Sequence, residues 1–455
     1  MRLVVALVSI LAIACGSHSN GSSDAPGAGG DSGGGGGDSG GDSGGGGGGT
    51  TIHVTLNNHP TNAAMYSFLV AYQDGSSAWK LAGAPSGDVY SFNVNSPSWG
   101  VAWTCIGNSA PQAGGGQIRQ VAEAHFAVAE RTSLSFDVPP RCTDNAPTTV
   151  ALTGTVSNRS GGGVWLVEFG GKTGFVNPQT GGYRIEALPG TRDVVLLHVQ
   201  SNGGGTTSDF VTTEALVDRA VTVNAATTHD LDASSAVATQ AFNVTIGVPL
   251  NGRALATTVL YSAGGTTPTL DRVSSQFESD ALDATQGVAG DVYDQQMLVA
   301  SNGQTAIVTN ATATPGDQTF SAPPPLGGAT SQVTGSTPYP IIHTTWAPYA
   351  STIGYVWTAT QTPTLQQCAS NIPCTIVWSS LLSPGVTGNS PGYTMPDLSA
   401  LTGWSANLAF VTGTMVTGYA EAGKSSGGAS DFPPVTPPPA GTKRTYVRSD
   451  FTVTP

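Results

Sequence analysis

The chain has 455 residues, and its 16 basic against 29 acidic residues give a formal net charge of -13. Because the chain has no basic patch to go with this balance, we expect no binding to nucleic acid. Only 10% of the residues are charged, and 61 glycines and 30 prolines accompany abundant threonine and serine. This composition favours short β-strands joined by many turns.

The first fourteen residues have the features of an export signal. Arg2 precedes a run of apolar and small residues from Leu3 to Ala14. The run is too short to cross a bilayer as a helix, but it has the length of a signal-peptide core. We therefore expect residues 1–14 to be cleaved from the mature protein.

The stretch Leu11-Ala12-Ile13-Ala14-Cys15 resembles the lipobox of bacterial lipoproteins, with Ala12 where leucine is commoner. The resemblance implies that Cys15 carries acyl chains and anchors the protein to a membrane, because two or more buried chains give stable attachment. Gly16, rather than aspartate, is similar to lipoproteins that are sorted to the outer membrane. The alternative is an ordinary secretory signal with a cysteine just after the cleavage site.

Residues 15–50 are predicted to form a disordered tether. Glycine, serine and aspartate make up almost all of this segment, so it lacks the apolar side chains that folding requires. A flexible coil of about 35 residues averages roughly 30 Å from end to end. We expect it to hold folded domains clear of the lipid surface.

The rest of the chain is predicted to be all-β, in tandem β-sandwich modules of immunoglobulin-like or prealbumin-like type. Alternating apolar and polar residues run from TIHVTL to YVRSDFTV, and even the alanine-rich segment Gln117–Glu130 favours a strand. A faint repeat places Tyr90 and Tyr183 in similar contexts, 93 residues apart. Repeats of this kind indicate stacked modules, which we place at residues 51–148, 149–240, 241–328 and 331–455.

The second module carries a local resemblance of its own. LTGTVSN is followed by GGYRIEALPG and VVLLHV, a pattern similar to the prealbumin-like or carboxypeptidase-regulatory-like family. Gly181 stands where that family usually has an acidic residue. The resemblance implies a seven-stranded sandwich that acts as a spacer or binding module without catalysis. The matching residues are Gly154, Val156, Gly182, Tyr183, Ile185, Leu188, Pro189 and Gly190.

The four remaining cysteines suggest two disulfides in an exported chain. Of the three possible pairings, Cys105 with Cys142 and Cys368 with Cys374 keeps each bridge within one proposed module. A zinc site does not fit, because five residues separate the thiols of CASNIPC and no histidine follows them.

Catalytic and metal-binding patterns are absent or incomplete. GNSPG matches the G-x-S-x-G pattern of hydrolases, but Pro391 favours an extended Ser390, and no histidine follows His343. This stretch is therefore interpreted as a turn. Four aspartates in one segment could bind calcium, but a solvated face is the favoured interpretation; they are Asp280, Asp283, Asp291 and Asp294. No metal and no cofactor are expected.

The last module contains four tryptophans that could bind a ligand: Trp346, Trp357, Trp378 and Trp404. Exposed rings at these positions would stack on sugars or pack against a protein. The alternation in GYVWTAT and TIVWSSL instead favours the inner face of a sandwich.

These observations predict an outer-membrane lipoprotein with a noncatalytic structural, adhesive or ligand-binding role. Its expected partners are the membrane, through the lipid anchor, and a surface glycan or protein. The alternative hypothesis is a surface-anchored hydrolase that cleaves glycans with carboxylates from the last two modules, since such pairs cannot be recognised by spacing alone.

Overall fold

The computed structural model describes residues 49–107, 116–201, 210–246, 253–273, 278–301, 304–368, 372–434 and 436–455. The predicted signal peptide, Cys15 and nearly all of the predicted tether lie outside these residues. The all-β prediction is confirmed, because strands dominate and the described α-helix, α2, covers only Pro384–Thr387. Within the described ranges, no helix is long and apolar enough to span a bilayer.

Hydrogen-bonded strands form one continuous large sheet. All neighbouring pairs are antiparallel except β6 and β27, which are parallel. The sheet order is β3 (Lys80–Leu81), β2 (Leu69–Asp74), β5 (Ser98–Gly107), β6 (Gln117–Ala127), β27 (Cys374–Leu382), β26 (Gly354–Gln361), β29 (Val416–Ser425), β30 (Lys443–Val453), β22 (Gln304–Thr312), β21 (Val292–Ser301), β18 (Arg253–Tyr261), β19 (Thr269–Val273), β13 (Phe210–Val223), β12 (Gly190–Ser201), β9 (Val164–Phe169) and β10 (Lys172–Phe175), with β16 (Val237–Ala238) beside β13.

Smaller sheets pack against this large one. They are β4 (Val89–Val94), β1 (Thr50–Asn57) and β7 (Ser133–Asp137); β11 (Gly182–Ala187), β8 (Val150–Ser157) and β14 (Thr227–Thr228), with β15 (Leu231–Asp232) also on β8; β20 (Glu278–Ala281), β17 (Gln240–Ile246) and β23 (Gln318–Phe320); and β24 (Thr330–Gly335), β25 (Ile341–Thr345) and β28 (Gly392–Thr394). Short 3-10 helices lie between strands: η1 (Ala63–Tyr66), η3 (Pro140–Cys142), η4 (Ala233–Ser235), η5 (Leu365–Gln367), η7 (Ala406–Leu408) and η8 (Gly428–Asp431).

The strands fall into four groups along the chain. We call β1–β7 the first strand group, β8–β16 the second, β17–β23 the third and β24–β30 the fourth. In each of the first three groups, the first strand lies at the centre of the small sheet, antiparallel to one neighbour and parallel to the other. The fourth group differs, since its small sheet is antiparallel throughout. Along the large sheet the groups follow the order first, fourth, third, second.

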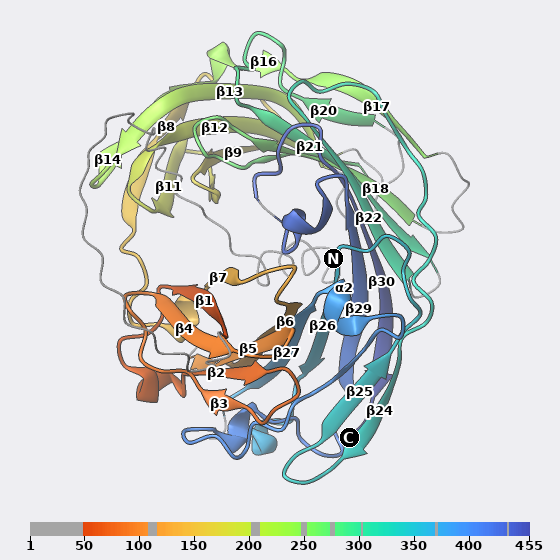
Figure 1. Cartoon of the computed structure of the whole chain (residues 1–455). Helices are drawn as coiled ribbons and strands as arrows, with labels where there is room; N and C mark the ends of the chain where they lie inside the picture. Colours follow the sequence, from red (N-terminus) through yellow and green to blue (C-terminus); the bar gives the residue numbers. More distant parts are fainter. Residues whose placement is uncertain are drawn as a thin grey trace, which may run out of the picture.

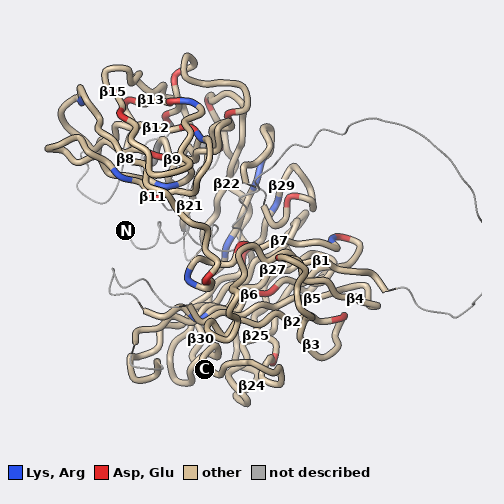
Figure 2. The backbone as a smooth tube through the Cα atoms, turned by 90° about the vertical axis from the view of Figure 1, so that its left-hand side faces the viewer, with Lys and Arg blue, Asp and Glu red and all other residues tan. Residues whose placement is uncertain are grey.

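The large sheet curves into an arch, and its two faces are covered by different groups (Figure 1). The small sheet of the first group packs on the face that carries Trp103 and Ala124. The opposite face carries Ala102 and Trp357, and the small sheets of the third and fourth groups cover it. Charged residues are spread thinly along the backbone (Figure 2). Because one core cluster contains residues of the first, third and fourth groups and the large sheet is continuous, neighbouring groups share cores and sheet hydrogen bonds instead of touching only at their ends.

A glycine explains a close approach in the second group. Gly154 in β8 pairs with Tyr183 in β11, and the Tyr183 hydroxyl donates a 2.6 Å hydrogen bond to the backbone oxygen of His229. A Cβ atom at position 154 would lie 2.0 Å from that same oxygen. Only glycine fits where the two backbones meet so closely.

Both expected cysteine pairs are bonded in the structure. Cys105 in β5 joins Cys142 in η3, and Cys368 joins Cys374 at the start of β27. The first bridge ties the end of the first group to its large-sheet strand. The second closes the short loop between β26 and β27.

Candidate functional site

Three of the four tryptophans considered as ligand-binding residues belong to the core. Trp357 and Trp378 have no exposed surface and Trp346 is 6% exposed, all in the cluster on the face of the third and fourth groups. Trp357 also donates a 2.9 Å hydrogen bond from Nε1 to the Thr344 hydroxyl. For these three residues the sugar-platform interpretation is wrong, because neighbouring strands and loops cover both faces of each ring.

Trp404 is different, because it is only partly buried and lines a pocket of about 320 Å³. Its ring stacks on Tyr339, with 5.5 Å between ring centroids and 21° between the planes. Its other neighbour is the buried Trp378, at 6.0 Å and 60°. The pocket is lined by Ser336, Pro338, Tyr339, Pro340, Ser399, Trp404, Ala406, Ala409, Phe410 and Thr412.

Two loops of the fourth group build this pocket, and hydrogen bonds hold them firmly. The Tyr339 hydroxyl, in the β24–β25 loop, donates to the Pro396 oxygen at 2.7 Å and accepts from the Leu398 amide at 2.9 Å. Trp378 donates from Nε1 to the Leu408 oxygen at 2.8 Å. Burial raises the pKa of Tyr339, so its hydroxyl keeps its proton and remains a donor. The pocket is therefore formed before any ligand arrives.

The lining residues of the pocket are uncharged, and their surface is polar and apolar in about equal parts. Aromatic rings and prolines form part of the pocket walls. The polar side-chain groups among the lining residues are the hydroxyls of Ser336, Tyr339, Ser399 and Thr412 and the indole nitrogen of Trp404. The Ser399 hydroxyl already donates to Asp397 at 2.7 Å. A volume near the lower end of the usual range for ligand sites fits a small ligand or the end of a longer chain. This chemistry suits a neutral molecule that has both an apolar ring face and hydroxyl groups.

A second polar cluster lies on the opposite face of the large sheet, on β29 and β30. The Arg448 guanidinium lies 3.9 Å from the centre of the Tyr419 ring and donates to Asp450 at 2.5 Å. Glu421 pairs with Arg448 across the two strands, which makes it a diagonal neighbour of Asp450. Burial raises the pKa of Glu421 to about 7, although Arg448 opposes the shift. The cluster thus places a buried carboxyl with a raised pKa beside the exposed side chain of Asp450.

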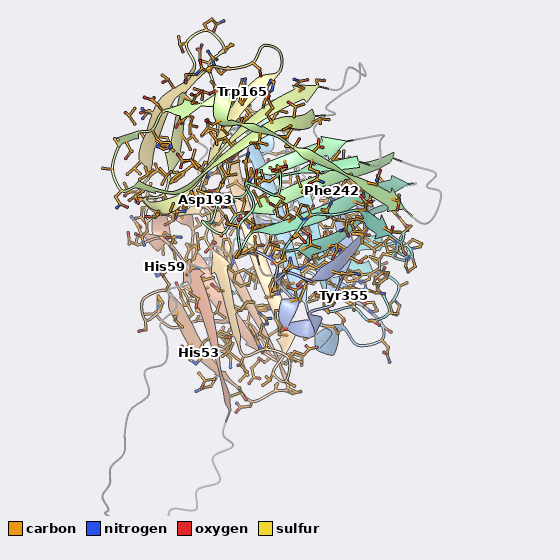
Figure 3. The ribbon with its side chains drawn as sticks, turned by 90° about the horizontal axis from the view of Figure 1, so that it is seen from above. His53, His59, Trp165, Asp193, Phe242 and Tyr355 are labelled. Atoms are coloured by element: carbon orange, nitrogen blue, oxygen red, sulfur yellow. A yellow bond between two sulfur atoms is a disulfide. The ribbon has the colours of Figure 1, made fainter. Side chains whose placement is uncertain are left out.

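Three of the four aspartates considered for calcium are buried instead of solvated, namely Asp280, Asp291 and Asp294. Asp291 is 1% and Asp294 4% exposed. Asp291 and Asp193 both accept hydrogen bonds from Arg219, at 2.8 to 2.9 Å. In Figure 3, Asp193 lies below Trp165 and to the left of Phe242. The solvated-face prediction is wrong for the three buried aspartates. Asp291 joins the third group to the second through Arg219.

Ser160, His198 and Glu214 approach one another without forming a catalytic triad. The Ser160 hydroxyl donates to Glu214 at 3.2 Å, and Nδ1 of His198 lies 3.1 Å from the same carboxyl. The other ring nitrogen, Nε2, lies 2.7 Å from the Gly162 oxygen. A triad needs serine and carboxylate on opposite ring nitrogens, and here both face Nδ1.

The remaining motifs behave as local structure. GNSPG forms the turn between α2 and β28, as predicted. Within the described ranges, no three of the histidine, cysteine, aspartate and glutamate side chains come close enough to hold a metal ion. The chain matches no known family model and no curated protein.

Sequence reasoning identified Trp404 but missed Tyr339 and Phe410. The signal for Tyr339 was present, because STPYPII places an aromatic residue between two prolines in a break between strands. Prolines stiffen such a loop and limit the conformations it can adopt. Phe410 has no comparable local signal, since its position depends on how the 396–412 loop folds back over β6 and β27.

Proposed function

We propose that this protein is an envelope-anchored, noncatalytic binding protein that holds a neutral carbohydrate in the Tyr339–Trp404 pocket. The observation that carries the proposal is an indole ring, stacked and partly open, in a pocket whose lining residues are uncharged and include serine and threonine hydroxyls. Sugar rings present an apolar face to such aromatic residues and hydroxyls to polar ones. Anchoring through Cys15 remains part of the proposal, because that residue lies outside the described ranges.

The positions of the pocket and of the chain entry support a display role. The chain enters the structure at Thr50, which pairs with Val94 close to the start of β5. The pocket loops lie at the other end of the sheet, where Arg119 of β6 donates to the Asn407 oxygen at 3.2 Å. From Arg119 to the end of β6 at Ala127 the strand extends about 26 Å. A tether leaving at Thr50 therefore leaves the pocket on the far side of the molecule.

Binding can be tested by calorimetry of the mature protein against neutral oligosaccharides. Trp404→Ala removes the stacking ring, and we expect it to weaken binding about tenfold or more, since such stacking contributes about 1 kcal/mol beyond buried area. Phe175→Ala is the matched control, because this ring is 73% exposed on β10, the far edge strand of the large sheet. Equal affinity of the Trp404 variant and the wild type would contradict the proposal.

The anchor has its own test. Cys15→Ser removes the sulfur that would carry the acyl chains, so we expect the protein to move from the membrane fraction to the soluble fraction. Incorporation of labelled fatty acid into the wild type, and none into the variant, is the accompanying measurement. A wild-type protein without label would end this part of the proposal.

A second candidate function follows from the Glu421 and Asp450 pair. A neutral carboxyl near an ionised one is the arrangement that glycoside hydrolases use, and diagonal neighbours on adjacent strands lie about 7 to 8 Å apart. In this hypothesis Glu421 is the general acid and Asp450 the base or nucleophile. Turnover of a glycan that Glu421→Gln abolishes would favour this function over binding alone.

A further inference from the structure

We propose that Glu123 is a buried proton-binding group that couples the firmness of the Tyr339–Trp404 pocket to pH. This inference rests on the proposed function for its consequence, namely a ligand affinity that falls as the proton is lost. The proton site itself stands on a separate cluster of buried polar groups beneath the pocket.

The cluster forms where the first and fourth groups meet. Glu123 on β6 lies opposite Ser380 on β27, in the parallel pair that joins these groups. The Tyr393 hydroxyl, from β28, lies against both of them. Yet Oε1 of Glu123, Oγ of Ser380 and the Tyr393 hydroxyl are all buried without a well-formed hydrogen bond. Three loosely satisfied polar groups at one place are unusual in a core.

Burial favours the neutral form of Glu123, whereas its polar neighbours His125 and Tyr393 favour the charged form. His125, on the same strand, has Nε2 at 3.2 Å from Oε2 of Glu123, so a protonated carboxyl can donate to it. Ala102 on β5 and Ser380 on β27 face Glu123 without charge. Arg119, a buried cation on the same face of β6, lies about 13 Å along the strand. Burial raises the pKa of Glu123 more than its polar neighbours lower it.

The cluster is connected to the pocket wall through tyrosines. Tyr339, whose ring forms part of that wall, is close enough to Glu123 and to Tyr393 to interact with both electrostatically. Tyr393 in turn packs on Trp357, with 4.5 Å between ring centroids. The pocket, its inner wall and the carboxyl thus form one continuous layer over β6 and β27.

Loss of the proton should loosen that layer before it disturbs the sheet. A carboxylate that is 2% exposed has little solvation. Its Oε2 lies beside a possible donor, His125 at 3.2 Å, while Oε1 is buried without a well-formed hydrogen bond, and burying charge that is only partly compensated is costly. Strands β6 and β27 are held by ladder hydrogen bonds on both sides, whereas residues 396–412 cover them as a loop. Water can therefore reach the carboxylate most easily by displacing this loop and Tyr339.

The first measurement needs no ligand. Hydrogen exchange of residues 396–412 is measured over a range of pH and corrected for the intrinsic effect of pH. Protection of these amides should fall about tenfold for each unit by which the pKa of Glu123 is lower with the loop open than with the loop closed. Glu123→Gln keeps the shape without the titration, so its protection should stay constant between pH 5 and pH 9. Identical profiles for the wild type and this variant would overturn the proposal.

The second measurement is affinity for the bound oligosaccharide over the same pH range. We expect wild-type affinity to fall about tenfold or more with rising pH, and Glu123→Gln to bind equally at all values. Glu168→Gln is the matched control, because Glu168 is another buried glutamate, far away in β9, and should keep the wild-type profile. Should no oligosaccharide bind, the proposed function fails while the exchange measurement still decides on Glu123.

Should Glu123→Gln prove unfolded, Ser380→Ala and difference infrared spectroscopy replace it. Ser380→Ala removes one polar neighbour and leaves the carboxyl in place. The infrared carbonyl band of the protonated Glu123 carboxyl should titrate at a different pH in Ser380→Ala than in the wild type. An unchanged titration in Ser380→Ala would overturn the assignment of the proton to this cluster.

Discussion

Arg219 joins two carboxylates that belong to different strand groups. It donates to Asp193 of the second group and, through both terminal nitrogens, to Asp291 of the third. Asp291 also accepts from the backbone amides of Ala263 and Val288. Removing the charge of Asp291 would leave Arg219 with Asp193 alone and would take the charged acceptor from both amides, and such a loss in a buried ion-pair network is strongly destabilising.

Asp291→Asn should therefore lower the free energy of unfolding by about 3 kcal/mol. The measurement is urea denaturation at neutral pH. Asp283→Asn, on an exposed turn of the same segment, is the control and should change stability by less than about 1 kcal/mol. An equal loss of stability in both variants would show that the ion pair between Arg219 and Asp291 does not stabilise the fold.

The burial of Asp291 could not be predicted from the residues next to it in the sequence. Four acids in one segment resemble a solvated face when only their neighbours in sequence are considered. The decisive partner, Arg219, lies 72 residues before Asp291. By contrast, the burial of Trp357 could be predicted, since the alternation in GYVWTAT is a local property of one strand.

Glu168 should make stability depend on pH. Burial raises its pKa to about 7 from an ordinary value of 4.5, although the Thr173 hydroxyl donates to it. The folded state thus retains a proton that the unfolded state releases, so stability falls as pH rises from about 4.5 to about 7 and is then level.

Glu168→Gln removes this effect. The variant should equal the wild type at pH 4 and exceed it by on the order of 2 to 3 kcal/mol at pH 8. Unfolding by urea at both pH values checks the difference. Glu186→Gln, whose side chain is 49% exposed, should show no such trend; a benefit for Glu168→Gln that persists at pH 4 would rule out titration as its cause.

At the scale of elements, β6 shows that a strand buried on both faces lacks the alternating sequence pattern by which strands are recognised. The sequence predicts Gln117–Glu130 to be mainly strand, and the structure confirms a strand over Gln117–Ala127. Its alternation is weak because six consecutive positions, Arg119–Ala124, are buried. Ala122 and Ala124 face the core of the first group, while Val121 faces that of the fourth. A strand covered on both sides loses the two-residue pattern. Its parallel partner, β27, lies more than 240 residues away, so no local signal could identify it.

The two disulfides should contribute unequally because they close loops of different length. Sequence separations of 37 and 6 residues correspond to about 4 and about 2 kcal/mol in the chain-entropy model. Replacing both Cys105 and Cys142 with serine should therefore lower stability more than replacing Cys368 and Cys374. Urea unfolding of the two double variants compares them directly. A larger loss for the Cys368 and Cys374 variant would contradict the loop-length explanation.

At the scale of the whole molecule, the order of the groups makes the last one the connector. The fourth group pairs with the first through β27 and with the third through β30, whereas the second group lies at one end of the sheet. Chain order alone predicts neighbours in series, so this arrangement was not foreseen. It depends on which sheet edges remain open after each group has folded.

A destabilising substitution in the fourth group should therefore increase hydrogen exchange in more strands than an equally destabilising one in the second group. Trp357→Ala removes a fully buried ring and should cost about 3 to 5 kcal/mol. Because β27 supports β6, hydrogen exchange should then increase in β5 and β6 as well as in β26 and β29. Leu152→Ala in β8, also fully buried, should increase exchange in the second group and leave β5 and β6 protected. Should both variants change only their own group, the shared sheet would not couple the groups, and the four would unfold independently.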